Sequence, residues 1–524
     1  MAILLIVFCT LIYVLINVVV YKLWVRPPNF PPGPRGVPLL GYAPLLAKKG
    51  PLFKLILSLT KKYGPVTGFY VGPTQPFICV AGPKAVKEAL HNDDLDGRPC
   101  GAILMSRTFG KRLGLLFVDG DSWQEQRRFV LRHLREFCMG KTLIEKQMMN
   151  EINDLIADIT ATSNANPDNI VDFKGMFVVS VINILWTFLG GKRFRRDDEM
   201  FKKLSINVEQ FLHGGNALKI SFPIPAFILR SFPSLPRLLG ISTQLFVPLQ
   251  KFIKETIEQH LYTRFKGDPA RDFIDVYLDQ IRAELEENSS TTFSKKQLIA
   301  IIQDLFGAGS DTSSSSIGLL AMTLIKHDTN LISKPRTTRL GFGILYLIHY
   351  PEIQQKLWEE INQICGDSLP SLSHRSRLPY TEAVLMEVIR LSSVAPLAVP
   401  HCALRETHLQ GFTIPQGSII AISLNSLMKD ISIWGDPENF RPERHLDQEG
   451  NLIQNESYTP FGTGKRMCLG EALARNTVFL FMACLVKKFE FKPVPGEPLP
   501  TLEPIIGIVL GPKPFRAVAI PRDH

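Results

Sequence analysis

The chain lacks the sequence features of several common protein classes. Its eight cysteines, at positions 9, 79, 100, 138, 365, 402, 468 and 484, are too far apart for a disulfide framework or a zinc site. This spacing fits a reducing compartment. The chain has no basic low-complexity tail and no basic run interleaved with aromatics, so nothing indicates nucleic-acid binding. The net charge of +10 suits an anionic membrane surface or an acidic protein partner instead.

No break in composition divides the chain after its N-terminal region. The length of 524 residues would by itself give roughly three domains, but without such a break we expect one large domain over residues 39–524. Its pattern of apolar residues predicts a β-hairpin over residues 66–81 and mostly helices elsewhere. Helices are expected at 83–90 and 351–365, and the region 143–260 is predicted to be helical with proline breaks.

Residues 2–21 form a long apolar run. About 20 such residues are enough to cross a bilayer as a helix. Lys22 and Arg26 follow at once, which by the positive-inside rule places the rest of the chain in the cytosol. A cleaved signal peptide is the alternative, but it would need a charged start, a shorter apolar core and a small-residue cleavage site. We therefore expect an uncleaved membrane anchor over residues 1–26.

A proline-rich segment over residues 27–38 follows the apolar run. It begins Pro27-Pro28-Asn29-Phe30-Pro31-Pro32-Gly33-Pro34. Such a run is stiff and extended and cannot continue a helix. We interpret it as a hinge that sets the distance and tilt of the folded domain from the membrane. A proline-rich motif that binds a partner protein is the alternative.

A glycine-rich loop near the end of the chain, Phe461-Gly462-Thr463-Gly464-Lys465-Arg466-Met467-Cys468-Leu469-Gly470, carries a single cysteine. Gly462 and Gly464 allow the backbone to turn tightly. Arg466 and the N-terminus of the helix expected after the loop both favour a thiolate at Cys468. No general base is near in sequence, so we interpret Cys468 as a soft metal ligand. A buried structural cysteine is the alternative.

The spacing Phe-x-x-Gly-x-Arg-x-Cys-x-Gly resembles the haem-binding loop of the cytochrome P450 family at all five fixed positions. This resemblance implies that Cys468 is the axial ligand of haem b, iron protoporphyrin IX. It also implies the family's fold, which is mainly α with a small β region and is preceded here by one transmembrane helix.

A Trp-x-x-x-Arg pair lies on a helix expected to open at Asp119-Gly120-Asp121-Ser122 with N-cap chemistry. Trp123 and Arg127 are four residues apart and share one face. The pair resembles the family's contact to a haem propionate; without the resemblance, a buried Trp beside an exposed Arg would be the simpler interpretation. The resemblance extends the propionate-binding role to Arg98, His401 and Arg466.

A long helix is expected from Ser294, and it contains Ala308-Gly309-Ser310-Asp311-Thr312. A carboxylate inside an apolar helix is costly to bury, and such violations of local rules are expected at functional sites. The segment resembles the family's oxygen-activating motif, in which Asp311 and Thr312 relay protons to dioxygen. The alternative is that Thr312 bonds back to its own helix while Asp311 lies at the surface.

A buried ion-pair network is predicted from two separate motifs. Glu387 and Arg390 are three residues apart on a helix, and Arg444 lies in Phe440-Arg441-Pro442-Glu443-Arg444. Together they resemble the family's Glu/Arg/Arg lock, whose role is structural, because removing one partner of a buried pair costs about 3–5 kcal/mol. The family usually has an aromatic residue where this chain has His445.

Residues 319–341 depart from the family's pattern. The helical pattern that ends at Gly318 continues naturally at Phe342, and the intervening span contains Pro335, which a helix interior resists. We interpret the span as an insertion, such as a retained intron or splice variant, that loops out of the fold. An inactive or impaired haem-binding splice product is therefore one alternative function.

The motifs together most resemble microsomal animal members of the family, and among these the insect hormone- and xenobiotic-metabolising branch. They imply a monooxygenase anchored in the endoplasmic reticulum membrane that inserts one atom of O2 into a steroid or terpenoid hormone, a fatty acid or a xenobiotic such as an insecticide. NADPH-cytochrome P450 reductase would supply electrons, with cytochrome b5 as a further donor, and it would dock on the basic stretch of Arg128, Arg132, Arg135 and Lys141. A reductase-independent haem-thiolate isomerase is the alternative, which Asp311 and Thr312 argue against.

Overall fold

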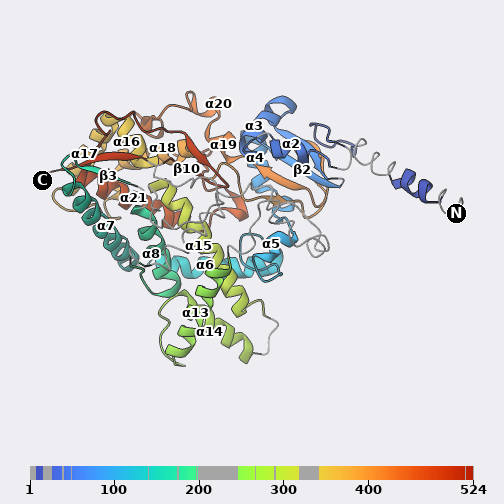
Figure 1. The fold of residues 1–524 in the computed structure, drawn as a ribbon, viewed down its shortest axis with the longest axis horizontal. Coiled ribbons are helices and arrows are strands. Elements are labelled where there is room, and N and C mark those ends of the chain that lie inside the picture. The colour runs from blue at the N-terminus through green and yellow to red at the C-terminus, as the bar shows by residue number, and fades with distance from the viewer. Residues whose placement is uncertain are drawn as a thin grey trace, which may run out of the picture.

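The computed structural model describes residues 7–15, 26–37, 40–48, 50–72, 74–139, 141–173, 176–195, 198, 246–265, 267–287, 291–317, 342–513 and 515–522. Within these residues the fold is mostly helical with small β-sheets at its edges, as predicted (Figure 1). The suspected insertion at 319–341, most of the 1–26 segment and the proline-broken part of 143–260 lie outside the described residues.

The larger helices form the body of the molecule. They are α3 (Leu52–Tyr63), α4 (Pro83–His91), α6 (Gly120–Met139), α7 (Lys141–Asn164), α8 (Met176–Gly190), α13 (Val247–Thr263), α14 (Phe273–Glu286), α15 (Lys295–Ile317), α16 (Phe342–His349), α17 (Pro351–Cys365), α18 (Pro379–Ser392) and α21 (Glu471–Lys488). The shorter ones are α2 (Ala43–Lys48), α5 (Ala102–Ser106), α19 (Leu424–Met428), α20 (Ile431–Trp434) and the 3-10 turns η1 (Asp93–Leu95), η2 (Arg375–Arg377), η3 (Pro442–His445) and η4 (Gly464–Arg466). The predicted helices at 83–90 and 351–365 are confirmed, and the Gln297 amide donates to Ser294 Oγ at 3.1 Å to cap α15.

The strands form separate small sheets. The largest has the order β1 (Val66–Val71), β2 (Gln75–Val80), β7 (Ile419–Ile422), β4 (His401–Cys402), with only the β2–β7 pair parallel. A second has the order β3 (Ile170–Asp172), β11 (Arg516–Pro521), β8 (Phe489–Lys492), and two hairpins pair β5 (Thr407–Leu409) with β6 (Phe412–Ile414) and β9 (Pro504–Ile506) with β10 (Leu510–Pro512).

The β1–β2 hairpin confirms the prediction for residues 66–81. The helical prediction for 143–260 is wrong at β3. Residues 170–172 are extended because they pair with β11, more than 300 residues further along the chain. Such a long-range partner leaves no local signal.

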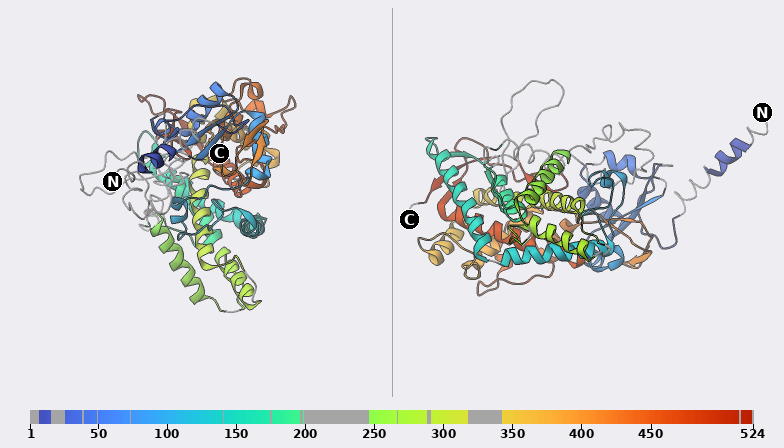
Figure 2. Two further views of the ribbon diagram at one scale, coloured as in Figure 1. Left: turned by 90° about the vertical axis from the view of Figure 1, so that its right-hand side faces the viewer. Right: turned by 90° about the horizontal axis from the view of Figure 1, so that it is seen from below.

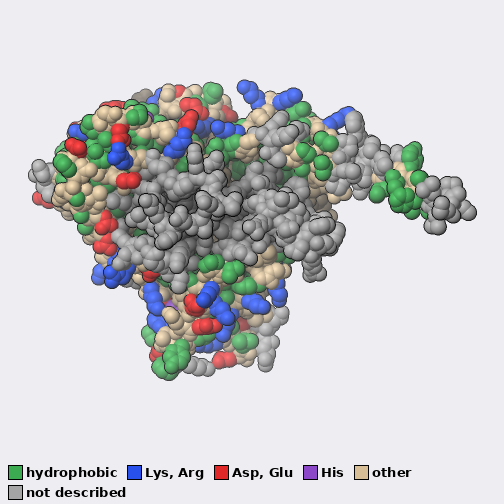
Figure 3. All heavy atoms as spheres, viewed as in Figure 1, with side chains coloured by type: hydrophobic (Ala, Val, Ile, Leu, Met, Phe, Trp, Pro, Cys, Tyr) green, Lys and Arg blue, Asp and Glu red, His purple; other side chains and the backbone are tan. Residues whose placement is uncertain are grey.

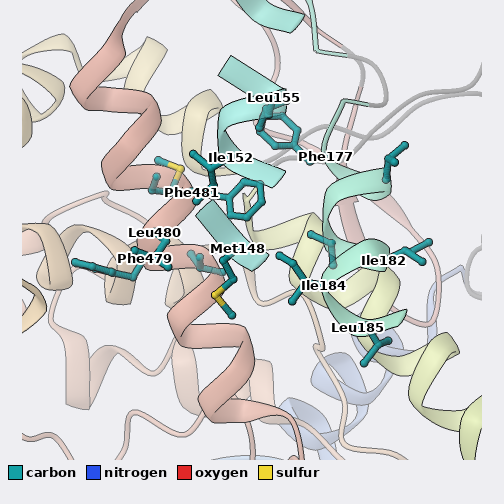
Figure 4. Close-up of a cluster of buried hydrophobic side chains, with 14 of the residues drawn as sticks. Met148, Ile152, Leu155, Phe177, Ile182, Ile184, Leu185, Phe479, Leu480 and Phe481 are labelled. Atoms are coloured by element: carbon teal, nitrogen blue, oxygen red, sulfur yellow. The ribbon is translucent and has the colours of Figure 1, made fainter. Parts of the chain in front are cut away.

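The core lies where α7, α8, α15 and α21 pack together. Figure 4 shows Met148 and Ile152 of α7, Phe177 of α8 and Phe481 of α21 meeting in one buried cluster. α15 passes close to α8, since a Cβ added at Gly309 would lie 3.0 Å from Leu185 Cδ2. These contacts fix the central helix that carries the predicted Asp311–Thr312 pair.

Residues 7–15 form a helix at the N-terminal end, drawn apart from the body in Figure 2. Its side chains are exposed and largely apolar, with Phe8, Leu11 and Leu15 each more than 60% accessible, and they form a continuous hydrophobic surface in Figure 3. Among the helices in the described ranges, none combines the length and apolar character needed to cross a bilayer.

Candidate functional site

The Cys468 loop is a tight structure that precedes α21. The Cys468 amide donates to Phe461 O at 3.0 Å and closes the loop. Gly462 and Gly464 both have positive φ, at 72° and 74°, as the glycine spacing predicts. A Cβ at Gly464 would lie 2.2 Å from the carbonyl oxygen of Leu90, so the loop also presses closely on α4.

The Cys468 thiol is exposed in the chain, yet it lies deep enough for burial to raise its pKa. A thiol that is both deep and accessible opens onto an internal space rather than the outer surface. In the chain alone, burial outweighs the groups that favour the thiolate. Those groups are a backbone hydrogen bond from Gly470 and the charge of Arg127, and not the predicted Arg466.

Arg466 is directed away from the thiol, toward the segment before α6. Its Nε donates to Asp96 O and its Nη1 to Val118 O, both at 2.9 Å. Its guanidinium carbon lies 3.5 Å from the ring centre of Trp123, a close cation–π contact. Burial lowers the pKa of Arg466 to about 10.

Arg98 is buried beside Arg466 and is held by backbone oxygens. Its Nε donates to Leu116 O at 3.0 Å and its Nη1 to Pro400 O at 3.2 Å. Burial, followed by the charge of Arg466, lowers the pKa of Arg98 to about 9. Two buried guanidinium groups side by side destabilise each other unless an anion lies between them.

His401 joins the same cluster from β4. It is 1% exposed, and its Nδ1 lies 2.8 Å from Leu95 O. Burial and the charges of Arg98 and Arg466 hold the pKa of His401 well below its ordinary value. The imidazole is therefore neutral in the chain alone, and with its Nδ1–H donated to Leu95 O, its Nε2 stays available to a ligand.

Trp123 and Arg127 share a face of α6, as their spacing predicts. Trp123 is buried, and the Arg127 guanidinium lies 5.6 Å from its ring centre. Arg127 Nη2 donates to Met467 O at 2.6 Å, which ties α6 to the residue before Cys468. The structure therefore brings all six residues predicted to bind the cofactor into one region: Arg98, Trp123, Arg127, His401, Arg466 and Cys468.

The donor set of this region fits a haem. A lone thiol facing an internal space suits an iron ligand, and a group of buried cations suits the two propionates. Asp96 and Asp119 are the carboxylates whose charges act on Arg98 and Arg466 in the described chain. Asp119 is already engaged by Arg112, so the cluster retains unbalanced positive charge.

Asp119 has a role that the sequence analysis missed. α6 begins at Gly120, so Asp119 stands just before its first residue, within the 119–122 segment expected to cap it, and Asp119 Oδ2 also accepts from the Arg98 amide at 2.8 Å and from Arg112 Nη2 at 2.7 Å. These bonds lower the pKa of the Asp119 carboxyl despite its burial. Its position just before a helix predicts a capping residue and gives no sign of the two arginine partners.

Asp311 and Thr312 lie within α15, as expected, but their side chains are outside the described part of the chain. One turn earlier, Ala308 is exposed although α15 runs through the middle of the molecule (Figure 1). Gly309 faces Leu185 of α8. The accessible side of α15 at Ala308 therefore opens onto internal space.

The predicted buried network is present. Arg390 donates from Nε to Glu387 Oε2 and from Nη2 to Glu387 Oε1, both at 2.8 Å, and all of these atoms are fully buried. Arg444 Nε donates to Glu387 Oε1 at 3.0 Å. His445 also enters the network, with Nε2 2.9 Å from Glu387 Oε2. These bonds lower the pKa of Glu387 to about 2, although burial opposes them.

Comparison with known proteins gives a consistent result across the chain. The family model described as "Cytochrome P450" matches residues 31–330 and 336–519. The chain is 33% identical to farnesoate epoxidase of Bombyx mori over 506 residues, covering 94% of each chain. It is 30% identical to probable cytochrome P450 303a1 of Drosophila melanogaster, covering 95% and 96%, and 32% identical to cytochrome P450 2B2 of Rattus norvegicus, covering 88% and 87%.

The family match spans the Cys468 loop, the cation cluster, α15 and the Glu387 network, which are the features that first suggested it. The chain therefore belongs to the cytochrome P450 family, and it is an oxidoreductase of the monooxygenase type with the haem-iron cofactor that this family implies.

Proposed function

We propose that this chain is an NADPH-dependent, haem b-containing monooxygenase that acts on a small lipophilic substrate. The overall reaction is RH + O2 + NADPH + H⁺ → ROH + NADP⁺ + H2O, where RH is the substrate. The observation that carries the proposal is the convergence of a deep, accessible thiol at Cys468 with the cluster of Arg98, Arg466 and His401.

Cys468 would be the axial ligand, and Arg98, Arg127, Arg466 and His401 would neutralise the propionates. When bound, the haem supplies the oxygen-activating chemistry. The residues of the chain position it: backbone oxygens hold Arg98 and Arg466, and the Trp123 ring contacts the guanidinium groups of both Arg127 and Arg466. Because these side chains are fixed before the group binds, little entropy is lost on binding.

Asp311 and Thr312 would manage protons on the substrate side. They follow Ala308, whose exposure supports an accessible surface on this part of α15. An acid and an alcohol next to each other can pass a proton from solvent to a reacting oxygen. Replacing Thr312 by Ala should uncouple NADPH consumption from product formation while leaving the haem bound.

A flavin-containing NADPH reductase, with cytochrome b5 as a second donor, would dock on α6. Arg128, Arg132 and Arg135 are exposed on this helix, while Arg127 of the same helix contacts the Cys468 loop. An acidic partner on that face would lie close to the thiol ligand. Screening by salt should therefore weaken reductase-dependent turnover.

Residues 1–26 would anchor the protein in the endoplasmic reticulum membrane, with the domain over 39–524 facing the cytosol. The exposed apolar surface of helix 7–15 supports a lipid contact. Arg26, the last residue of the expected anchor, donates to Gly33 O at 2.7 Å and to Pro34 O at 2.8 Å in the 27–38 hinge, which bends the hinge back toward its start. The hinge would then set the tilt of the domain.

The span 319–341 would be an insertion. The family match omits residues 331–335, which lie inside this span. α16 begins directly after it, and its residues 342–348 are all buried against the core, as expected if α16 continues the pattern of α15. If the span is retained in the protein, an impaired haem binder is the expected product. Sequencing of the transcript decides whether the span is always encoded.

The deciding experiment is the difference spectrum of the reduced, carbon-monoxide-bound protein. Wild type should show a Soret band shifted far to the red, and Cys468→Ser should lose it. Reconstitution with reductase and NADPH should then give oxygenated product. Turnover of a substrate without reductase would instead support an isomerase, and a protein without the red-shifted band would contradict the proposed function.

A further inference from the structure

The net positive charge of the chain is confined to its N-terminal part. The chain has 59 Lys and Arg and 49 Asp and Glu, and residues 1–87 hold ten of the basic residues and none of the acidic ones. These residues therefore carry the whole net charge of +10, whereas residues 88–524 have equal numbers of basic and acidic residues. Charge segregated in this way attracts an anionic surface to one end of the molecule.

The hinge is bound to the first sheet and does not form a loose tether. The Gly68 amide of β1 donates to Pro32 O at 2.9 Å, so the hinge runs along the edge of that strand. Phe30 is 7% exposed, and its ring stacks on Tyr70 with the ring centres 5.4 Å apart. The charged residues of this part of the chain are therefore carried on a fixed surface.

α3 contributes the cationic face of this surface. Its inner side packs on the sheet through buried residues that include Leu55, Ile56 and Leu59. Its outer side carries the exposed residues Lys54, Ser58, Lys61 and Lys62. Positions separated by three, four or seven residues share one side of a helix, so the three lysines form one stripe.

The lysine stripe keeps its positive charge. Lys54, Lys61 and Lys62 form no ion pair with any Asp or Glu that the structure describes. The one described acid on which the charge of Lys54 acts is Glu503, and Glu503 is already paired with Lys513 at 2.8 Å. An anion from outside the chain can therefore bind at the stripe without displacing a partner.

The stripe lies beside the end of the expected anchor. Arg35 and Tyr63, the last residue of α3, both interact electrostatically with Arg26. Figure 1 shows α2 and α3 at the end of the molecule from which the N-terminal helix extends, and Figure 3 shows Lys and Arg side chains standing out from that end. A bilayer that holds the anchor is therefore the nearest large surface to these lysines.

Exposed apolar side chains accompany the cations. Val37 and Leu40 are 45% and 54% exposed in the loop before α2, and Gly41 of this loop pairs with Val71 of β1. Apolar side chains enter the boundary between headgroups and acyl chains, while long cationic side chains reach the phosphates. This combination suits a headgroup layer, whereas an acidic protein requires only the charge.

We propose that the stripe of Lys54, Lys61 and Lys62, together with Arg35, binds anionic phospholipid headgroups and holds the catalytic domain in one orientation on the membrane. This contact is additional to the anchor over residues 1–26, on whose position the inference rests, and it goes beyond the proposed oxygenation activity. It is also separate from the reductase surface proposed on α6.

The test measures lysine acetylation in the full-length, haem-loaded protein, reconstituted into lipid nanodiscs. One membrane is pure phosphatidylcholine, and the other contains about 30% phosphatidylserine. Lys54, Lys61 and Lys62 should be acetylated about threefold or more slowly on the anionic membrane, and high salt should remove the difference. Lys251 and Lys254, which are 77% and 67% exposed on α13, should react equally on both membranes.

A matched pair of triple variants gives a second readout, the ratio of phosphatidylserine to phosphatidylcholine retained around the protein in mixed membranes. Wild type should enrich phosphatidylserine about twofold over the bulk membrane. The variant K54Q/K61Q/K62Q should lose this enrichment, and K251Q/K254Q/K356Q, which removes the same charge from exposed sites elsewhere, should retain it. The carbon-monoxide spectrum checks that both variants still bind haem.

Equal acetylation on the two membranes, slowing that survives high salt, or equal enrichment in the two triple variants would overturn the inference. Slowing that appears only when reductase is added would also overturn it, because the stripe would then bind an acidic protein. Extraction with alkaline carbonate tests the anchor separately. Retention of the protein in the membrane without any lipid preference sinks this inference alone, and absence of the red-shifted band sinks the proposed function.

Discussion

His445 Nε2 lies 2.9 Å from Glu387 Oε2, so a histidine completes the buried network around this carboxylate. The imidazole packs against Trp434 and Tyr458, with ring centres 5.7 Å and 5.5 Å away. Both Glu387 oxygens thereby accept from two side chains each. A residue that departs from the family's usual aromatic thus serves as a hydrogen-bond donor as well as a packed ring.

Replacing His445 by Phe should keep the packing but remove one donor to a buried carboxylate. We expect a loss of about 1–3 kcal/mol in the free energy of unfolding, because the freed lone pair cannot reach water. His445→Ala should cost more, since it also removes the ring. Urea unfolding followed by tryptophan fluorescence gives both values. Equal stability of wild type and His445→Phe would show that the hydrogen bond contributes nothing.

Glu387 should make the protein sensitive to acid. Its folded pKa is about 2, below the ordinary 4.5, so its stabilising effect is fully present above pH 4.5 and is lost as the pH falls toward 2. The free energy of unfolding should fall by about 1.4 kcal/mol per pH unit from this group in that window. Glu387→Gln should be less stable at neutral pH and show a shallower acid slope; an unchanged slope contradicts the assignment.

Gly464 and Gly462 provide a matched pair of substitutions. Both residues have positive φ. A Cβ added at Gly464 would lie 2.2 Å from Leu90 O, whereas a Cβ added at Gly462 would have no atom within 4 Å. Gly462→Ala should cost about 1 kcal/mol from backbone strain alone. Gly464→Ala should cost clearly more and reduce haem incorporation, measured as the ratio of haem absorbance to protein. Comparable losses in both variants would show that the contact with α4 is unimportant.

His260 should make the stability of α13 and α14 fall as the pH rises, which is opposite to the response expected from Glu387. Its Nε2 lies 2.7 Å from Asp272 Oδ2, and although burial lowers the pKa of His260, the hydrogen bond and charge of Asp272 raise it overall. The stabilisation is therefore fully present below pH 6.5 and is lost as the pH rises through the folded pKa. Hydrogen exchange in α13 and α14, corrected for intrinsic rate, should speed up over that range.

Asp272→Asn tests the same pair, because it keeps an acceptor for the Asp275 amide at the start of α14 but removes the charge. The pH dependence of exchange in α13 and α14 should flatten in this variant. A dependence as steep as that of wild type would place its origin elsewhere.

Local sequence was sufficient to predict features whose residues lie close together in the chain. The glycine spacing of the Cys468 loop, the Trp123–Arg127 pair and the Glu387–Arg390 pair were predicted correctly because each lies within a few residues on one loop or helix turn. β3 was missed, and the bonds that Asp119 accepts from Arg98 and Arg112 were not anticipated, because the partners are distant in the chain or belong to another loop.

The sequence by itself indicated the family and the order of the motifs, and it predicted Cys468 as the thiol ligand, because these depend on residue type and short spacing. Only the tertiary structure decided which charges face each other: that Arg127 rather than Arg466 acts on the Cys468 thiol, and that His445 joins Glu387. The reason is that Coulomb energies and desolvation depend on distance and burial in space, and separation along the chain sets neither.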